Sequence, residues 1–229
     1  FRVRDFLRGQ PVVHHHHGEP PFRENLRQFA EREIGLGRKG IVSTPDLLRG
    51  YPEATWVPNV VPLEAEPYTP KTATESTGEV IVGHSPTKKE LKNTAEFRRV
   101  MGLLSARNAG VKTRIIENTP HLECLSLKRE CDLFFDHMQG YFGVSSLEAL
   151  ALGVPVIAGL DRWNREQIRK RTGAEDIPWI LAHNTVQLEE RVETLVKDAA
   201  MREEIGLKSR SWMEKNWTPE KWASLLEKI

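Results

Sequence analysis

The sequence has few cysteines, no long hydrophobic run and no excess of one charge. Its two cysteines, Cys124 and Cys131, form no CxxC pair, so a structural zinc site is not expected. This cysteine usage fits a reducing compartment, and we expect a cytoplasmic protein. No apolar stretch approaches the roughly 20 residues of a membrane span. Because 33 Lys and Arg residues balance 32 Asp and Glu residues, a nucleic-acid partner that needs a strongly basic surface is not expected.

The length of 229 residues is sufficient for one large domain and part of a second. The sequence begins at Phe1 rather than at a methionine, so we expect that a targeting segment or a whole domain can have been lost from its start. Residues 14–17 are four histidines that continue an apolar stretch. Because alternate side chains of a strand face opposite sides, a metal site shared by all four is the less favoured interpretation.

A regular alternation of short apolar runs and helical periodicity begins near residue 79. Strands are predicted at 80–82, 111–116, 132–135, 154–158 and 179–181. Helices are predicted at 88–109, 121–129, 146–152, 186–198, 199–215 and 219–229. This alternation predicts an α/β fold with a doubly wound parallel sheet. Such sheets bind ligands beyond the C-terminal ends of their strands, which makes the loops after Val82, Ile116 and Phe135 candidates for a site.

The segments before residue 79 differ from one another in composition. Three further strands are predicted at 11–17, 40–43 and 55–57, whereas residues 61–78 are rich in Pro, Thr and Glu and show no periodicity. We therefore predict a partial N-terminal domain over 1–60, a linker over 61–78, a ligand-binding domain over 79–217 and a C-terminal helix over 218–229.

A cluster of lysines follows the first strand of the predicted sheet. Thr87 and Glu90 have the spacing of a capping box, which predicts that a helix begins near Lys88. Lys88, Lys89 and Lys92 then lie in the first turn and a half, where the helix dipole disfavours cations. A phosphate bound at the helix N-terminus would offset this cost. The alternative is a solvated basic surface that needs no ligand.

A glycine-containing loop follows the strand predicted at 132–135. Gly140 and Gly143 would let the backbone approach a ligand closely. Ser145 and Glu148 form a second capping box. Glu148 therefore has two interpretations, since it can be a cap partner for the backbone or an acid that binds ribose hydroxyls.

Residues 143–157 closely resemble the FG-x4-EA-x-A-x-G-x-PV signature of retaining GT-B glycosyltransferases of the family-four type. Residues 84–87 and 92–94 resemble the H-x-P-[ST] and KGT elements of the same group, with Asn93 in place of the glycine. Residues 57–60 resemble its VPN element. The resemblance implies two Rossmann-like domains, of which the first is partial here, and a last helix that crosses back to the first domain.

The resemblance also implies roles for individual residues. The lysine cluster would bind the donor diphosphate, together with Ser145, Ser146 and the backbone N–H groups of residues 144–146. Glu148 would bind the nucleotide ribose. The loop that faces the transferred sugar would be Gly140, Tyr141, Phe142 and Gly143.

The family has a pair of acids with the spacing E-x7-E. Glu148 matches the second acid, whereas Gly140 stands at the position of the first. Backbone groups near Gly140 would do the work of that acid, as expected for a subgroup that reads GWYG here. Residues 17–23 resemble an HG-x(n)-R element that lines the interdomain cleft of relatives. His17 would bind the transferred sugar or the acceptor, although a strand-end histidine with a backbone partner is an equal alternative.

The resemblance implies transfer of a hexose-like sugar, with retained configuration, from a nucleotide diphosphate donor such as a UDP- or GDP-sugar. The acceptor, which can be a saccharide, a lipid or a protein, is unknown, and no metal or other cofactor is expected. The alternatives are a nucleotide-sugar epimerase on the same fold and a non-catalytic nucleotide-sugar-binding module. Peripheral membrane association would come through the missing N-terminal part. Because the first domain is partial, we expect this chain to bind nucleotide but to transfer sugar poorly.

Overall fold

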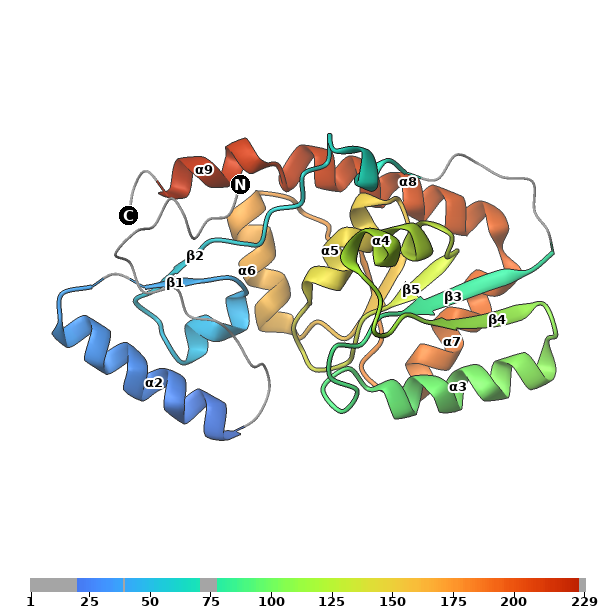
Figure 1. Cartoon of the computed structure of the whole chain (residues 1–229), viewed down its shortest axis with the longest axis horizontal. Helices are drawn as coiled ribbons and strands as arrows, with labels where there is room; N and C mark the ends of the chain where they lie inside the picture. Colours follow the sequence, from blue (N-terminus) through green and yellow to red (C-terminus); the bar gives the residue numbers. More distant parts are fainter. Residues whose placement is uncertain (1–19, 39, 71–77, 227–229) are drawn as a thin grey trace. The chain divides into compact units, whose positions relative to one another are not determined.

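The computed structural model describes residues 20–38, 40–70 and 78–226 (Figure 1). The chain divides into two compact units, which we call the small unit (Phe1–Val60 with Glu220–Ile229) and the large unit (Val61–Pro219). The strand predicted at 11–17 and the candidate residue His17 lie outside the described residues.

The large unit is built on a parallel sheet of five strands in the order β4-β3-β5-β6-β7. The strands are β3 (Val80–His84), β4 (Val111–Ile115), β5 (Leu133–Phe135), β6 (Val156–Ala158) and β7 (Trp179–Leu181). Within this sheet the chain first forms β3, then adds β4 on one side of it and continues with β5 on the other. The doubly wound α/β fold is therefore confirmed, and its topological switch point lies between β3 and β5, where ligands of such sheets bind.

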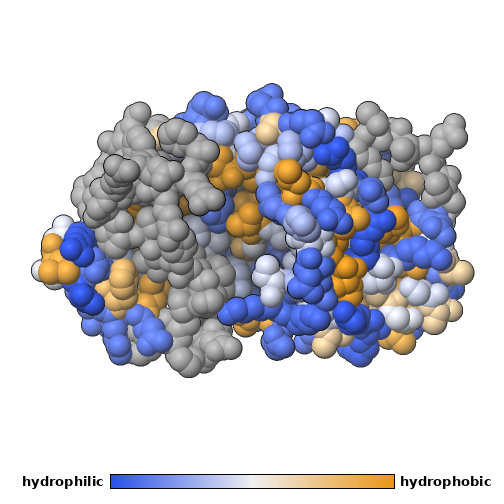
Figure 2. Space-filling model, viewed as in Figure 1, coloured by the Kyte–Doolittle hydropathy of each residue, from blue (hydrophilic) through white to orange (hydrophobic). Residues whose placement is uncertain are grey.

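Helices cover both faces of this sheet (Figure 1). They are α3 (Thr94–Arg107), α4 (His121–Arg129), α5 (Val144–Ala151), α6 (Arg162–Thr172), α7 (Thr185–Lys197) and α8 (Ala199–Asn216). Helices α3 and α7 pack together on one face, and α4, α5 and α8 pack on the other. Because both faces are covered, strand residues such as Val82, Leu133 and Ile157 are fully buried, which explains the continuous apolar runs in the sequence. Hydrophilic residues are interspersed with hydrophobic ones over the face of the large unit in Figure 2.

Helix α6 was not predicted from the sequence. Its residues are almost all polar, and only Asn164, Ile168 and Thr172 are buried. An apolar stripe of one isoleucine gives no detectable period, so the signal that predicts helices was missing here. The side chain of Asp161 caps the helix by accepting a hydrogen bond from the backbone N–H of Asn164.

The part of the predicted linker that the structure describes is folded onto the large unit. A short 3-10 helix, η2 (Glu66–Tyr68), contacts α4, and Tyr68 is buried. The Arg210 guanidinium on α8 donates hydrogen bonds to the carbonyl oxygens of Tyr68 and Leu63. Residues 61–70 therefore belong to the large unit, although their Pro-rich sequence carries no regular period.

The small unit contains α2 (Pro20–Gly35), β1 (Ile41–Val42), η1 (Pro45–Arg49) and β2 (Thr55–Trp56), with β1 and β2 paired in parallel. Helix α2 was also missed, although Leu26, Ala30 and Glu33 are buried at helical spacing. The last helix, α9 (Pro219–Leu226), places Trp222 with its ring centroid 6.2 Å from that of Trp56. Among the described residues, no helix is both long and apolar enough to cross a membrane.

Candidate functional site

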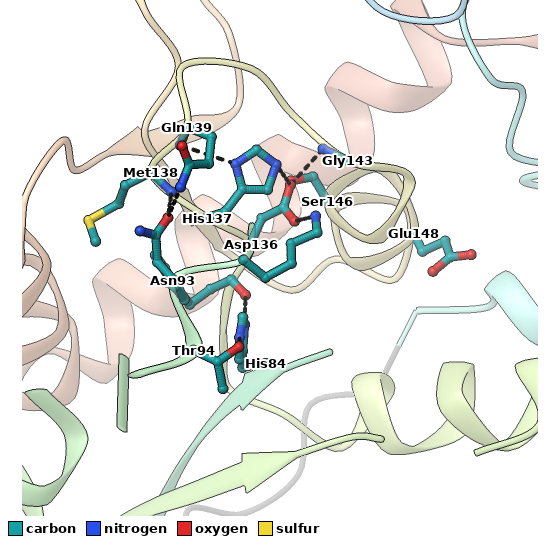
Figure 3. A network of polar contacts seen from close by, with 12 residues as sticks. His84, Asn93, Thr94, Asp136, His137, Met138, Gln139, Gly143, Ser146 and Glu148 are labelled. Carbon is teal, nitrogen blue, oxygen red and sulfur yellow. Dashed lines mark hydrogen bonds and ion pairs between the residues drawn. The ribbon is translucent and has the colours of Figure 1, made fainter. Parts of the chain in front are cut away.

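The predicted site residues of the large unit gather at the carboxyl edge of the sheet, on the loops after β3 and β5. The Asp136 carboxylate, directly after β5, is the centre of this cluster (Figure 3). Its Oδ1 accepts a hydrogen bond from Lys92 Nζ at 2.5 Å. Its Oδ2 accepts hydrogen bonds from the Gly143 N–H at 2.7 Å and from the Ser146 hydroxyl at 2.6 Å. Two predicted phosphate-binding residues, Lys92 and Ser146, are thus brought together by an acid to which the sequence had given no role.

The charge of Asp136 is held by this cluster. Burial alone would raise the pKa of the carboxyl, but the neighbouring His137 and Lys92, with the hydrogen bonds from Lys92 and Ser146, lower that pKa well below its usual range. Gly143 fits the pair closely, because an added Cβ would lie 2.5 Å from Lys92 Nζ. A larger residue at this position would therefore have to displace the Lys92 ammonium group.

His84, the last residue of β3, joins the two strands at the switch point. Its Nδ1 lies 3.0 Å from the carbonyl oxygen of Phe135, and its Nε2 lies 2.9 Å from the Thr94 hydroxyl. Since a carbonyl only accepts, we assign the proton to Nδ1 and an accepting role to Nε2. Burial lowers the pKa of His84 to about 4, so the ring is neutral at pH 7.

The helix predicted to begin near Lys88 begins at Thr94 instead. Residues 85–93 form a loop that ends at Asn93, whose φ of 54° is in the left-handed region. Asparagine tolerates this conformation better than most residues, which explains how it replaces the glycine of the KGT element. Its Oδ1 accepts hydrogen bonds from the Met138 N–H at 2.8 Å and from Gln139 Nε2 at 3.3 Å, and so ties the two loops together (Figure 3).

The predicted capping box at Thr87 and Glu90 is therefore wrong, because no helix starts there. Lys88 and Lys89 lie exposed on the same loop, and Lys89 Nζ pairs with Glu117 at 3.0 Å. The expected cost of lysines at a helix N-terminus does not arise. The role of Lys88 and Lys89 in phosphate binding consequently stays a prediction that rests on their position at the carboxyl edge.

Helix α5 begins at Val144 with Gly143 as its N-cap, so the second predicted capping box is also wrong. The Ser146 N–H donates to the Gly143 carbonyl at 3.0 Å, which leaves Val144 and Ser145 as the first-turn residues whose N–H groups suit an anion. The Ser145 Oγ atom is buried and has no hydrogen-bond partner among the described residues.

Glu148 makes contacts quite different from those of a cap. Its Oε2 accepts a hydrogen bond from Lys128 Nζ at 2.5 Å, and its Oε1 lies 2.8 Å from His121 Nε2. Burial and, to a smaller extent, the negative charge of Glu148 raise the pKa of Tyr68 to about 12. Figure 3 shows the carboxylate pointing away from the Asp136 cluster. The interpretation of Glu148 as a cap partner is thus excluded, and its role as a ribose ligand stays a prediction.

The aromatic rings of the predicted sugar loop, and one of its backbone carbonyls, contact other parts of the protein. Tyr141 and Phe142 are buried, with the Tyr141 ring against His137 and the Phe142 ring against Trp179. Gly140 has a φ of 90°, and its carbonyl oxygen accepts hydrogen bonds from the Asp161 N–H and from Asn164 Nδ2. That carbonyl is therefore already engaged by the protein.

Lys128 and His121 were not identified from the sequence. Lys128 lies three residues after Leu125 on the buried face of a helix that was correctly predicted, so a lysine on an apolar stripe was the available signal. Within the described ranges, no three His, Cys, Asp or Glu side chains are grouped as metal ligands. The expectation that no metal takes part stays a prediction.

The sheet order and the strand-end loops place the large unit in the Rossmann-like α/β class. The chain belongs to the family described as glycosyl transferases group 1, whose profile matches residues 63–212. A search of curated protein sequences gives no match.

Solved structures of GT-B glycosyltransferases share the fold. TarM from S. aureus, in a complex with fondaparinux, α-GlcNAc-glycerol and UDP, has a TM-score of 0.69 and 20% identity over 93% of this chain and 50% of its own. HepE from Anabaena, in a complex with UDP and glucose, has a TM-score of 0.72 and 13% identity over 99% of this chain and 73% of its own. The chain spans about half the length of the TarM structures that it matches.

Proposed function

We propose that this chain binds the nucleotide sugar donor of a glycosyltransferase at the carboxyl edge of its five-stranded sheet. The observation that carries the proposal is that Asp136 links Lys92 to the start of α5 at this edge, with Glu148 one turn further along the same helix, in a member of a glycosyltransferase family. A cation and free helical N–H groups suit a diphosphate, and a carboxylate suits ribose hydroxyls.

The chemistry that follows is transfer of a hexose with retained configuration, as in family-four enzymes. The leaving group is a nucleoside diphosphate, so fixed positive groups that stabilise its developing charge lower the barrier. Lys92 and the Val144 and Ser145 N–H groups supply such charge, and Lys88 and Lys89 add to it from the loop. No metal or other cofactor is required by this scheme.

The donor nucleotide is proposed to be a UDP-sugar first and a GDP-sugar second. TarM and HepE, which share the fold, were both solved with UDP. Glu148 would hold the ribose of either nucleotide, because the base does not change the diol. The acceptor is proposed to be a saccharide, a lipid or a protein, and the acceptor panel described below distinguishes these classes.

The domain assignment is part of the same proposal. Residues 1–60 are proposed to be the end of an acceptor-binding domain, which would bring His17 to the reaction as the catalytic residue nearest the sugar. Residues 79–217 would be the donor domain, and 218–229 the helix that returns to the first domain. If the acceptor-binding wall is incomplete in this chain, donor binding should survive whereas positioning of the acceptor would be lost.

The test combines binding with turnover. Calorimetry should show saturable binding of UDP, weakened roughly ten- to a hundredfold by Lys92→Ala and less by Lys89→Ala. Lys197→Met, a change in an exposed pair on α7, is the matched control and should bind UDP normally.

Radiolabelled UDP-glucose is then offered to an acceptor panel with this chain and with a version extended upstream of Phe1. A changed sugar without acceptor would favour an epimerase, and UDP binding without turnover by either version would favour a non-catalytic module.

A further inference from the structure

Glu148 is held from two sides by partners of very different accessibility. Lys128 Nζ donates to Oε2, and the Lys128 side chain is only 2% exposed. His121 Nε2 lies on Oε1, and the His121 side chain is 61% exposed. The first contact is internal to the fold, whereas the second lies where solvent or a ligand can replace it.

We propose that Lys128 is a positioning residue for nucleotide ribose, which it serves by fixing the Glu148 carboxylate. His121 is proposed to occupy the outer oxygen of Glu148 until the ribose diol takes its place. This inference rests on the proposed function and assigns a separate task to each partner.

The ammonium group of Lys128 is not explained by packing. It lies on the face of α4 that packs against the rest of the large unit, with Nζ 5.3 Å from the centroid of the Phe134 ring. Burying an ammonium ion is costly unless a carboxylate pairs with it, and a methionine of similar length would fill the space without that cost. The pair with Glu148 offsets the cost and fixes the direction of the carboxylate.

A fixed carboxylate suits a vicinal diol. Two oxygens with about four acceptor positions allow Glu148 to keep the hydrogen bond from Lys128 and still accept two hydroxyl groups. Because the side chain is already oriented, little further ordering is needed when the ribose binds. Only the contact with His121 has to break, and an exposed side chain can turn away into water.

The two partners therefore have opposite expected effects on affinity. Loss of Lys128 releases the carboxylate and should weaken nucleotide binding. Loss of His121 removes a competitor and should leave nucleotide affinity equal or higher. A merely structural role for the whole cluster would lower affinity in both cases.

The experiment is calorimetry on the 229-residue chain with UDP and with pyrophosphate, which lacks the ribose. Lys128→Met should weaken UDP roughly tenfold and leave pyrophosphate unchanged. In a Glu148→Gln background, Lys128→Met should have no further effect on UDP, because the group through which it acts is gone. Lys197→Met is the matched control for loss of a lysine.

A second measurement does not depend on whether Lys128→Met folds. His121→Ala is compared with the wild type using UDP and 2′,3′-dideoxy-UDP. Any gain in affinity should appear with UDP and not with the dideoxy compound, which has no diol; weaker UDP binding by His121→Ala would overturn the proposal.

The outcomes separate this inference from the function on which it rests. Equal losses of UDP and pyrophosphate in Lys128→Met, or UDP binding untouched by that change, would overturn the role of Lys128 alone. A wild-type chain that binds no UDP would remove the proposed function as well.

Discussion

Two lysine–carboxylate pairs lie in the large unit, and they differ in which partner is the more exposed. In each pair the lysine Nζ lies 2.5 Å from a carboxylate oxygen. In the Lys92–Asp136 pair the lysine is the more exposed partner, at 13% against 1%. In the Lys128–Glu148 pair the carboxylate is the more exposed partner, at 9% against 2%.

This difference in exposure gives the two ion pairs different chemical uses. The first pair presents a cation outward and keeps its acid inside, which suits a diphosphate. The second presents an acid outward and keeps its cation inside, which suits ribose hydroxyls. Neither pair changes the net charge of the unit, so the polarity of the edge comes from the placement of the charges.

The largest expected effect is on folding, at the inner acid of the first pair. Asp136→Asn leaves Lys92 without its carboxylate and gives the Gly143 N–H and the Ser146 hydroxyl a poorer acceptor. We expect a loss of about 3–5 kcal/mol in the free energy of unfolding. Urea denaturation measures it, with Glu193→Gln on the exposed face of α7 as the control. A loss no larger than that of the control would show that Asp136 does not hold this edge together.

The corresponding change in the second pair should cost less stability and more ligand affinity. Glu148→Gln also leaves its lysine without a carboxylate, but the amide oxygen still accepts from Lys128 and only the exposed His121 loses its partner, so we expect a loss of about 3 kcal/mol in unfolding free energy. It should also weaken UDP binding, because an amide is a poorer partner for two hydroxyls. The two variants are compared by denaturation and calorimetry. The comparison of the pairs breaks down if Glu148→Gln binds UDP as the wild type does.

His84 lies beside the Lys92–Asp136 pair, and its ring is neutral at pH 7, so its titration gives a further test of this part of the large unit. Its pKa is about 4 in the folded protein against an ordinary 6.5, so the unfolded chain binds the proton more readily. The contribution of the neutral His84 ring to stability is fully present above pH 6.5 and is lost as the pH falls toward 4. Between pH 7 and pH 5 we expect a loss of about 2 kcal/mol from this group.

The measurement for His84 is urea denaturation at both pH values in the wild type and in His84→Gln. Glutamine keeps a donor for Phe135 and an acceptor for Thr94, but it does not titrate. The variant should therefore lose less stability on acidification. An identical pH dependence in the two proteins would show that His84 is not kept neutral by the fold.

The smallest expected effect concerns the loop between the pairs. Gly140→Glu restores the first acid of the family, but φ at this position is 90° and an added Cβ would lie 3.4 Å from Asp161 Oδ2. We expect a loss of about 1–2 kcal/mol in stability and no gain in donor affinity. Denaturation and calorimetry test this, with Gly102→Ala in α3, where a Cβ meets nothing within 4 Å, as the control. A stable variant with tighter donor binding would show that the backbone of this loop can accommodate an acid.

The sheet could be predicted from the sequence, and the pairs could not. Continuous apolar runs predicted all five strands of the large unit, since both faces of the sheet are buried. The helix at 121–129 was predicted with its exact bounds. Helix α3 was extended too far toward its N-terminus, because the left-handed turn at Asn93 ends a loop that has the composition of a helix.

The pairs depend on contacts between residues far apart in the sequence. Lys92 meets Asp136 across 44 residues, and Lys128 meets Glu148 across 20. No spacing rule predicts such contacts before the sheet order is known. Local patterns instead suggested capping boxes at both helix starts, and the tertiary contacts of Glu148 replaced the local one.

The most direct test of the account is to locate bound UDP by two-dimensional NMR of the 229-residue chain. We predict that UDP shifts the backbone amide signals of Val144 and Ser145 and the ring signals of His121, whereas inorganic pyrophosphate shifts only the first two. Shifts that avoid the start of α5 and His121, or no shifts at millimolar UDP, would contradict donor binding at this edge of the sheet.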